Sequence, residues 1–430
     1  MPKIDLKSVE FNKAHRVWLA VGAVLILLLF IGAVWAPRGG DHALTSRPGL
    51  PKAALAPPER PEDWRGDIDY RAMDRRLRAM MTDRSMQGLA VAVVEKGRLS
   101  FVQGYGLTAE NGAPVDARTV FRWASLSKTV AGTLTARLAG DGALSLQDPL
   151  SVFDTSLKLP GDAQIGLTLE QLLSQRTGLG RNAYDGRLED GEDPNIIRGS
   201  FASLKPVCPP GTCHTYQNIA YDTITEVIHA RTGLDYEEAV RRRLFGPLGM
   251  TSATFGEAGL KGSAQWAKPT RHGRALPFSD AYYHVPAAAG VNSTIVDLAI
   301  WMQAQMGLRP DVLSPSVLGE VQRARVGTAR PYGRLNIGRE LKAPGYCLGM
   351  RSFTYRGHDL VGHSGGVAGY RATMMFEPAT RTGIVMLWNS DANLPFRYQA
   401  EFFDRVYGLP FTDFLELDRG DPIPTSSVSD

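Results

Sequence analysis

The chain has 430 residues, of which 43% are hydrophobic, and its formal net charge is +4. A chain of this length and composition can bury a large core, which excludes a small scaffold held together by disulfides. The 48 basic and 44 acidic residues nearly balance and form no block of like charge in the body, so the charge gives no indication of a nucleic-acid partner.

The N-terminal region contains a segment that predicts a membrane anchor over residues 17–36. From Val17 to Trp35 the residues are uncharged and mostly apolar, and about 19 such residues let a helix cross a bilayer core. Basic residues in 1–16 precede the segment, and the positive-inside rule keeps that end in the cytoplasm. A cleaved signal peptide is the alternative, but the segment runs into Trp35-Ala36-Pro37, a poor match to a cleavage site. We therefore expect a single-pass protein of the cell (inner) membrane with its body on the periplasmic side.

A proline-rich linker and a first hairpin are expected after the anchor. Residues 37–65 contain six prolines and no hydrophobic periodicity, which is typical of an extended tether. In residues 69–81 apolar and basic residues recur at helical spacing. Residues 88–97 and 98–106 are rich in β-forming residues and meet at Lys96-Gly97, which predicts a β-hairpin.

The middle of the chain, residues 107–340, is predicted to be mostly helix and loop. Thr168 with Gln171 three residues later resembles a capping box, which opens a short helix that ends before Thr177-Gly178. Further helical patterns cover residues 220–232, 236–244 and 294–306.

β-Strand character returns near the end of the chain. Residues 371–377 and 383–388 predict an antiparallel pair, a helix is expected over 395–406, and residues 419–430 have the composition of a disordered tail. β segments at both ends of a body spanning 66–418, with helices between them, predict an α+β fold. One antiparallel sheet is assembled from the two ends and flanked by helices, and a mostly helical subdomain is inserted.

Ser125 and Lys128 stand at the start of an apolar helical run and form the first candidate for catalysis. Positions three apart share one face of a helix, so the hydroxyl and the amine can interact. A lysine with a lowered pKa can take the proton of a serine, and the free N–H groups of a first helical turn favour developing negative charge. A Ser-x-x-Lys pair arises about once by chance in a chain of this length, so further motifs are needed.

Two further motifs can supply the remaining chemistry. Tyr216 and Asn218 lie where a turn leads into a helix; a phenol can relay a proton, and an amide can bind a substrate carbonyl. Residues 362–366, Gly-His-Ser-Gly-Gly, precede the C-terminal strand pair. Glycines there let a ligand lie along the backbone, and N–H groups at a strand edge can stabilise an oxyanion.

These three motifs in this order resemble the penicillin-recognising serine hydrolases related to class C β-lactamases, or β-lactamase/transpeptidase-like proteins. The resemblance covers roughly residues 69–409 and includes further blocks at 88–93, 172–179, 244–250, 288–294 and 362–370. It implies that Ser125 is the acylated nucleophile and that Lys128 and Tyr216 transfer protons. Asn218 would hold the substrate.

The resemblance also implies roles for residues of the glycine-rich strand. It implies that His363 and Gly365 lie on the strand lining the cleft, and that the N–H groups of Ser125 and Gly366 form the oxyanion hole. β-Lactamases of this type usually carry lysine where this chain has His363, and histidine is similar to the esterase and D-amino-acid peptidase branches. Because histidine titrates near neutrality, we expect carboxylate-bearing substrates to bind better at mildly acidic pH. Further candidates for the cleft wall are Arg176, Tyr282, Tyr283 and His284.

The three cysteines can form a disulfide if the body lies in an oxidising compartment. Cys208 and Cys213 bracket a turn-rich Pro-Pro-Gly-Thr spacer that can bring them close enough to bridge. In an oxidising periplasm we expect a disulfide between them, with Cys347 left over. Unpaired, buried thiols are the alternative.

Other hydrolase chemistries fit less well. Residues 362–366 also match the Gly-x-Ser-x-Gly elbow of α/β-hydrolases, with Ser364 as nucleophile, but no histidine follows His363 to complete a triad. His214, Cys213 and His229 lack the spacing of zinc ligands, so no metal or other cofactor is implied.

The sequence thus predicts a membrane-anchored serine hydrolase that forms an acyl-enzyme. Its substrate would be an ester, a D-amino-acid peptide or a β-lactam, and the predicted location makes cell-wall peptide a reasonable natural one. The alternative keeps the fold without efficient turnover: a module that binds penicillin or envelope polymer, or that acylates slowly.

Overall fold

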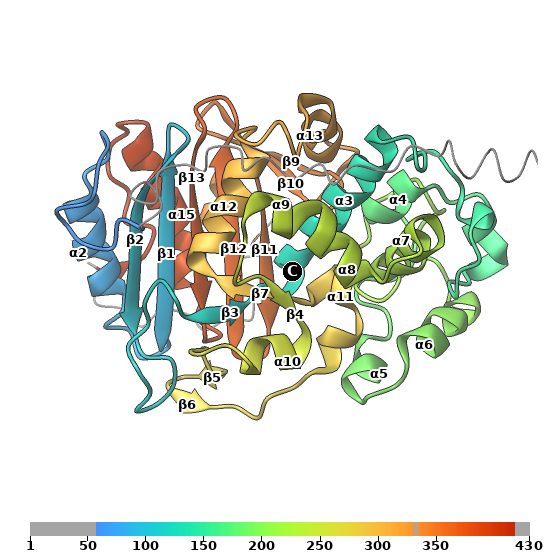
Figure 1. The fold of residues 1–430 in the computed structure, drawn as a ribbon, viewed down its shortest axis with the longest axis horizontal. Coiled ribbons are helices and arrows are strands. Elements are labelled where there is room, and N and C mark those ends of the chain that lie inside the picture. Colours follow the sequence, from blue (N-terminus) through green and yellow to red (C-terminus); the bar gives the residue numbers. More distant parts are fainter. Residues whose placement is uncertain (1–56, 330–331, 333–334, 418–430) are drawn as a thin grey trace, which may run out of the picture. The chain divides into compact units, whose positions relative to one another are not determined.

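The computed structural model describes residues 57–329, 332 and 335–417 (Figure 1). The predicted anchor at 17–36, the residues before it, most of the linker and the tail at 419–430 lie outside the described residues. Within the described ranges, no helix has the length and apolar character needed to span a bilayer.

One antiparallel sheet forms the centre of the body, and the described residues contribute eight strands to it. β1 lies between its hairpin partner β2 and the C-terminal β13, and Leu89 faces Trp388 across the β1–β13 pair. The prediction of a sheet built from both ends of the body is therefore confirmed. In spatial order the strands are β2 (Arg98–Gly106), β1 (Gly88–Glu95), β13 (Thr382–Trp388), β12 (Tyr370–Glu377), β11 (His358–Val367), β10 (Arg351–Tyr355), β9 (Lys342–Tyr346) and β8 (Val326–Gly327).

Helices cover both faces of the sheet (Figure 1). Along β1 the side chains alternate: Ala90 and Ala92 join one core, and Leu89 and Val91 join the other. Every residue of β1 is buried because both faces are covered, which explains its nearly continuous apolar run. The first core contains α3 (Lys128–Gly140) and α12 (Ile295–Gln305), and the second contains α2 (Tyr70–Met80) and α15 (Leu394–Val406).

Short helices of the inserted part gather on the side of the body away from β2 (Figure 1). Thr168 and Gln171 form the predicted capping box at the start of α4, each side chain accepting the other residue's backbone N–H. The pattern predicted over 236–244 changes at Arg241, where an α-helix gives way to a π-helical turn. These helices include α4 (Leu169–Leu173), α5 (Asp185–Glu189), α6 (Pro194–Ser200), α7 (Ile224–Thr232), α8 (Tyr236–Val240) and α11 (Pro286–Ala289).

A second, small sheet within residues 107–340 was not predicted. Its strands are β3 (Val120–Arg122), β7 (Val291–Thr294) and β4 (Thr254–Phe255). Strands of two to four residues are too short to show a period-two pattern, so the sequence carried no signal for them. The sheet matters because β3 leads directly to Ser125 and β7 pairs with β3.

The packed body begins before residue 66, where the linker was expected to end. Trp64 is buried with its ring 4.8 Å from that of Phe101, measured between centroids. The Val102 N–H donates to the Pro58 carbonyl over 3.1 Å. Residues 58–65 therefore pack on β2 as part of the body.

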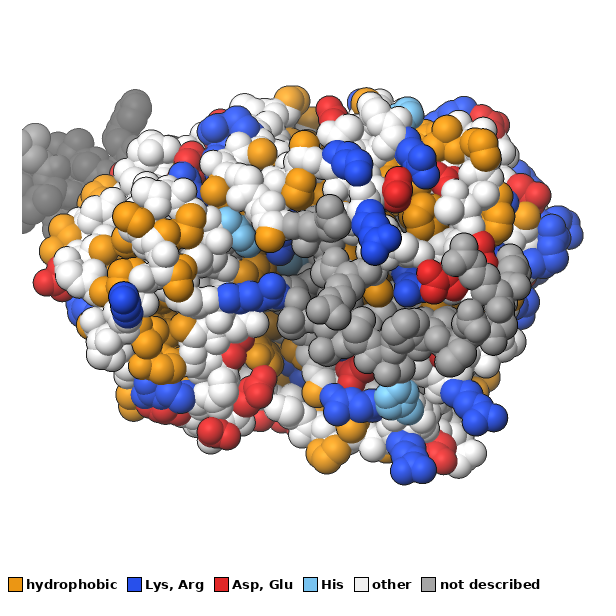
Figure 2. Space-filling model, turned by 180° about the vertical axis from the view of Figure 1, so that it is seen from behind, with side chains coloured by type: hydrophobic (Ala, Val, Ile, Leu, Met, Phe, Trp, Pro, Cys, Tyr) orange, Lys and Arg blue, Asp and Glu red, His pale blue; other side chains and the backbone are white. Residues whose placement is uncertain are grey.

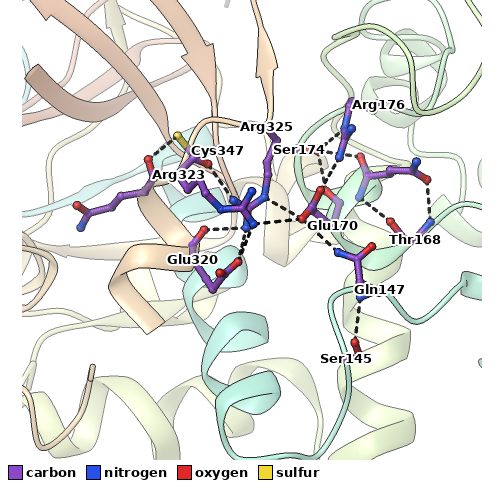
Figure 3. Close-up of polar contacts among 12 residues, drawn as sticks. Ser145, Gln147, Thr168, Glu170, Ser174, Arg176, Glu320, Arg323, Arg325 and Cys347 are labelled. Atoms are coloured by element: carbon purple, nitrogen blue, oxygen red, sulfur yellow. Dashed lines mark hydrogen bonds and ion pairs between the residues drawn. The ribbon is translucent and has the colours of Figure 1, made fainter. Parts of the chain in front are cut away.

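A largely buried ion-pair network joins α4 to the β8 edge of the sheet (Figure 3). Arg325, with 1% of its side chain exposed, lies 3.0 Å from Glu170 of α4 and 2.6 Å from Glu320 of α13 (Pro315–Gln322). Arg176 pairs with the same Glu170 over 2.8 Å, so that Glu170 lies between two arginines (Figure 3). The guanidinium of Arg176 is thus engaged in holding the 172–179 segment in place.

The described surface carries both signs of charge. On the face shown in Figure 2, basic and acidic side chains are interspersed among polar and apolar ones. Exposed large apolar side chains are also present, as is usual for globular proteins. Those of the inserted part with more than half of their area exposed are Val152, Ile165, Ile196 and Val207.

Candidate active site

Ser125 lies in a single 3-10 turn, η2 (Ala124–Ser127), that leads directly into α3. Ala124 has a φ of 49°, a left-handed conformation that is uncommon for a residue with a Cβ and often marks a functional site. The Trp123 N–H donates to the Val291 carbonyl (2.9 Å), and the Val291 N–H donates to Ser127 Oγ (3.0 Å). Strand β7 therefore holds the turn that presents Ser125.

Gly365 allows β11 to approach this turn closely. A Cβ at position 365 would lie 2.1 Å from the Trp123 carbonyl oxygen and 2.9 Å from the Ser125 nitrogen. Only glycine permits such an approach of two backbones. Gly366, the next residue, lines the same cavity as Ser125. The strand expected to supply an oxyanion-hole N–H thus lies beside the backbone of the serine.

Lys128 is fully buried, and its ammonium contacts polar atoms and an aromatic face. Nζ donates to Asn218 Oδ1 over 2.6 Å and to the Ala288 carbonyl over 3.2 Å. It also lies 4.6 Å from the centroid of the Tyr216 ring. Ser125, Tyr216 and Asn218 together line a cavity of about 410 Å³. Four residues taken from two separate motifs thus meet at one place.

The segment that carries Tyr216 and Asn218 is held by Gln175. Gln175 Oε1 accepts the Gln217 N–H (2.7 Å), and Gln175 Nε2 donates to the Gln217 carbonyl (2.9 Å). The 172–179 block of the sequence therefore positions the tyrosine loop. In the turn before this loop the structure joins Cys208 to Cys213 by a disulfide, while Cys347 is a free, buried thiol.

Two acidic residues of the cavity wall, Asp185 and Glu189 of α5, were not predicted. Asp185 Oδ2 accepts from Asn218 Nδ2 over 2.7 Å and from the Tyr282 hydroxyl over 3.2 Å. That hydroxyl also lies 2.9 Å from Glu189 Oε1. Burial raises the pKa of Asp185 above its usual value, while Asn218 and Lys128 oppose this shift. The acid therefore borders both the cavity and the amide that contacts Lys128.

A second charged group lines another part of the cavity. Asp391 Oδ2 accepts from Arg271 Nε over 2.5 Å, and Asp391 Oδ1 lies 3.1 Å from Arg371 Nη1. The same Oδ1 accepts the Gly369 N–H over 3.0 Å. One carboxylate thus links the β11–β12 turn to two arginines, which partly neutralises the charge of these arginines at the cavity.

His363 is buried, with 2% of its area exposed, and it is not among the residues that line the cavity. Its Nδ1 lies 2.6 Å from the Ser364 carbonyl oxygen, and its Nε2 lies 3.2 Å from the Tyr346 hydroxyl. Burial lowers the pKa of His363 well below its usual value, and the positive charges of Arg351 and Lys128 lower it further. This shift favours the neutral imidazole and argues against the expected gain in carboxylate binding at mildly acidic pH, which stays a prediction.

Of the other candidates for the cleft wall, only Tyr282 lines the cavity in the described part of the chain. The ring of Tyr283 covers the guanidinium of Arg122, 3.9 Å from its centroid, and His284 lies 3.6 Å from Asp280 near the surface. Arg176 is held in the network around Glu170. The sequence alone did not distinguish the residue that lines the cavity from the three that do not.

The elbow alternative, with Ser364 as nucleophile, finds no support in the geometry. Ser364 lies inside β11 opposite Thr373, whereas a nucleophile elbow requires a sharp turn from a strand into a helix. Its hydroxyl lies 2.8 Å from the Tyr332 hydroxyl. Ser125, by contrast, lies between a strand and a helix and faces a cavity.

Comparison with known proteins shows the family of the chain. The family model described as "Beta-lactamase" matches residues 73–408. The chain belongs to the beta-lactamase family. The resemblance proposed from its motifs is thereby confirmed, and so is the β-lactamase/transpeptidase-like α+β fold.

Individual members of the beta-lactamase family show moderate similarity. The chain is 27% identical to the "Unguisins hydrolase ungD" of Aspergillus violaceofuscus over 333 residues, 70% of this chain and 58% of that relative. It is 25% identical to a D-aminopeptidase of Gluconobacter oxydans over 361 residues, 79% of this chain and 62% of the relative. The chain therefore spans less than two thirds of the length of these curated relatives. The structure of an octameric penicillin-binding protein homologue from Pyrococcus abyssi has the same fold, with a TM-score of 0.70, 22% identity, and coverage of 80% of this chain and 78% of that one.

Proposed function

We propose that this protein hydrolyses a carbonyl substrate through an acyl-enzyme on Ser125. The observation that carries the proposal is the meeting of Ser125, Tyr216 and Asn218 on one cavity of about 410 Å³, with the Nζ of Lys128 bonded to Asn218 and lying over the Tyr216 ring. A buried serine that shares a cavity wall with a phenol, three residues before a buried lysine, supports a role in nucleophilic catalysis.

In acylation, Ser125 Oγ attacks the carbonyl carbon while its proton passes to the pair formed by Lys128 and Tyr216. The tetrahedral oxyanion then collapses, the bond to the leaving group breaks, and the pair returns a proton to that group. In deacylation a water molecule loses a proton to the same pair and attacks the acyl carbon. The acid product leaves, and the proton returns to Ser125 Oγ.

The backbone N–H groups of Ser125 and Gly366 would stabilise the oxyanion, because Gly365 lets β11 approach the serine turn. The pairing of β10 with β11 ends at Arg351 opposite Gly362, whereas the pairing of β12 with β11 continues to Val367. The edge of β11 beyond Gly362 can therefore accept an extended acyl chain as an added strand, with Asn218 binding its amide carbonyl.

Esters, D-amino-acid peptides and β-lactams all present such a carbonyl. The name of one relative, a D-aminopeptidase, favours an amide bond as the natural target. We further propose that residues 17–36 anchor the protein in the inner membrane with its catalytic body in the periplasm, which would place it near cell-wall peptide. This proposal rests on the apolar run and the basic residues before it.

The test compares the two serines in one assay. Ser125→Ala should abolish both labelling by a fluorescent fluorophosphonate and turnover of a p-nitrophenyl ester, with a loss of at least about 10³-fold in kcat. Ser364→Ala, at the position of the alternative nucleophile, should keep turnover. Activity lost in Ser364→Ala and kept in Ser125→Ala would refute the proposal. Labelling of Ser125 without turnover on esters, D-peptides or β-lactams would favour the binding module.

A further inference from the structure

The side-chain amide of Asn218 lies between the amine of Lys128 and the carboxyl group of Asp185. Its Oδ1 is 2.6 Å from Lys128 Nζ, and its Nδ2 is 2.7 Å from Asp185 Oδ2. An ammonium can only donate hydrogen bonds, and an ionised carboxylate can only accept them. Each neighbour therefore requires the same orientation of the amide, with its oxygen toward Lys128 and its NH₂ toward Asp185.

The carboxyl group of Asp185 is held through one of its oxygens and through its backbone. Asp185 is 8% exposed, and the Tyr282 hydroxyl shares its one proton between Asp185 Oδ2 at 3.2 Å and Glu189 Oε1 at 2.9 Å. The backbone N–H of Asp185 donates to the Asn182 carbonyl over 3.1 Å. Tyr184, just before it, has a φ of 62°, which turns the chain into α5 at this point. The position of Asp185 is therefore set by the loop and by Tyr282.

We propose that Asp185 is a positioning residue that acts through Asn218 on Lys128. This inference rests on the proposed function, in which Lys128 and Tyr216 move the proton of Ser125. Without an acceptor at position 185, the amide can rotate by half a turn and present its NH₂ group to the ammonium. Two donors would then face each other in a buried site, and Lys128 would lose the hydrogen bond that directs it.

The alternative is that Asp185 acts only through its negative charge. Asp185 and Lys128 do interact electrostatically, since Lys128 is one of the groups that lower the pKa of this acid. The two roles can be separated by Asp185→Asn, which removes the charge but keeps a carbonyl oxygen that can accept from Asn218 Nδ2. Asp185→Leu has a similar shape and removes both the charge and the acceptor.

The experiment measures the rate of fluorophosphonate labelling and the kcat for a p-nitrophenyl ester. Asp185→Leu should slow both by about 10- to 100-fold, the range expected for the loss of a hydrogen bond to a charged group. Asp185→Asn should recover most of this loss. Asp190→Leu removes an exposed acid just after the same helix and should stay within about twofold of the wild type. Equal losses in Asp185→Leu and Asp185→Asn would overturn the orientation role.

A double-mutant cycle tests whether the effect passes through the amide. In an Asn218→Ala background, Asp185→Leu should have no more than about a twofold further effect. If it slows labelling as strongly there as in the wild type, Asp185 does not act through Asn218, and the inference is overturned. Thermal melting checks each fold, and Asp185→Ala replaces the leucine variant in the cycle if the latter does not fold. A wild-type protein that neither labels nor turns over would overturn the proposed function as well, whereas the wrong variant pattern in an active protein overturns only this inference.

Discussion

Replacing Gly365 by alanine should damage acylation more than stability. The added Cβ would lie 2.1 Å from the Trp123 carbonyl oxygen, whereas ordinary contact begins near 3.4 Å. The two backbones must therefore separate by about 1.3 Å, the difference between these distances. The Trp123 turn is bonded to β7 and β11 is bonded to β12, so the separation moves the Gly366 N–H relative to Ser125, away from the proposed oxyanion position. Misplacement by about 1 Å costs about 100-fold, and the loss of one oxyanion donor costs about 10²–10³-fold.

We thus expect Gly365→Ala to lower kcat/KM for a p-nitrophenyl ester by about 10²–10³-fold. Overpacking of this kind should destabilise the fold by about 1–3 kcal/mol, which urea unfolding can measure. Gly319→Ala, in α13 with no atom within 4 Å of the added Cβ, is the control; it should keep activity and gain about 0.5–1 kcal/mol. A Gly365→Ala variant with activity within fivefold of the wild type would refute the close approach of β11 to the nucleophile turn.

Two further predictions concern stability. Burial raises the pKa of Asp222 from its ordinary value of 3.8 to about 7, so between these pH values the folded protein binds a proton that the unfolded chain releases. The free energy of unfolding contributed by this proton is lost as the pH rises from about 4 to about 7. Urea midpoints measured across this pH range should therefore fall less steeply for Asp222→Asn than for the wild type. Equal pH dependence of the two midpoints would contradict the prediction. Ala124→Gly should change stability by less than about 1 kcal/mol, because relief of the left-handed conformation offsets the lost methyl group. Ala131→Gly, equally buried but inside α3, is the control and should lower the free energy of unfolding by about 2 kcal/mol. Equal losses of stability in the two variants, measured by calorimetry, would show that Ala124 is not strained.

The sequence was sufficient for the parts of the fold whose signals are local. Strand β1 is a continuous apolar run, the α4 capping box is contained within four residues, and the hairpin at Lys96 and Gly97 has the positive φ angles of a tight turn. Strands β9 and β10 were not predicted. β9 contains Pro344 and Gly345, which weaken any strand signal, and it is defined by its pairing with β10.

In the site, too, residues with a local sequence signal could be predicted and residues placed only by the fold could not. Ser125, Lys128, Tyr216 and Asn218 belong to short motifs, so they could be named in advance. Asp185 could not, because it reaches Asn218 only through the packing of α5, and a single Asp-Gly in a loop has no pattern that points to an amide 33 residues away. The residue type at 363 was evident from the sequence, but the lowered pKa of its side chain follows from burial, which only the fold determines.

The arrangement around Lys128 explains why an amide stands between the amine and the acid. A carboxylate in direct contact favours the charged form of an amine, and an amine that keeps its proton cannot accept one from Ser125. In this site the Asn218 amide is hydrogen-bonded to both Lys128 and Asp185. The Ala288 carbonyl and the Tyr216 ring are further neighbours of the amine. In the proposed mechanism, the amide thus directs the amine by hydrogen bonding at a smaller electrostatic cost to proton transfer than a directly bonded acid would impose.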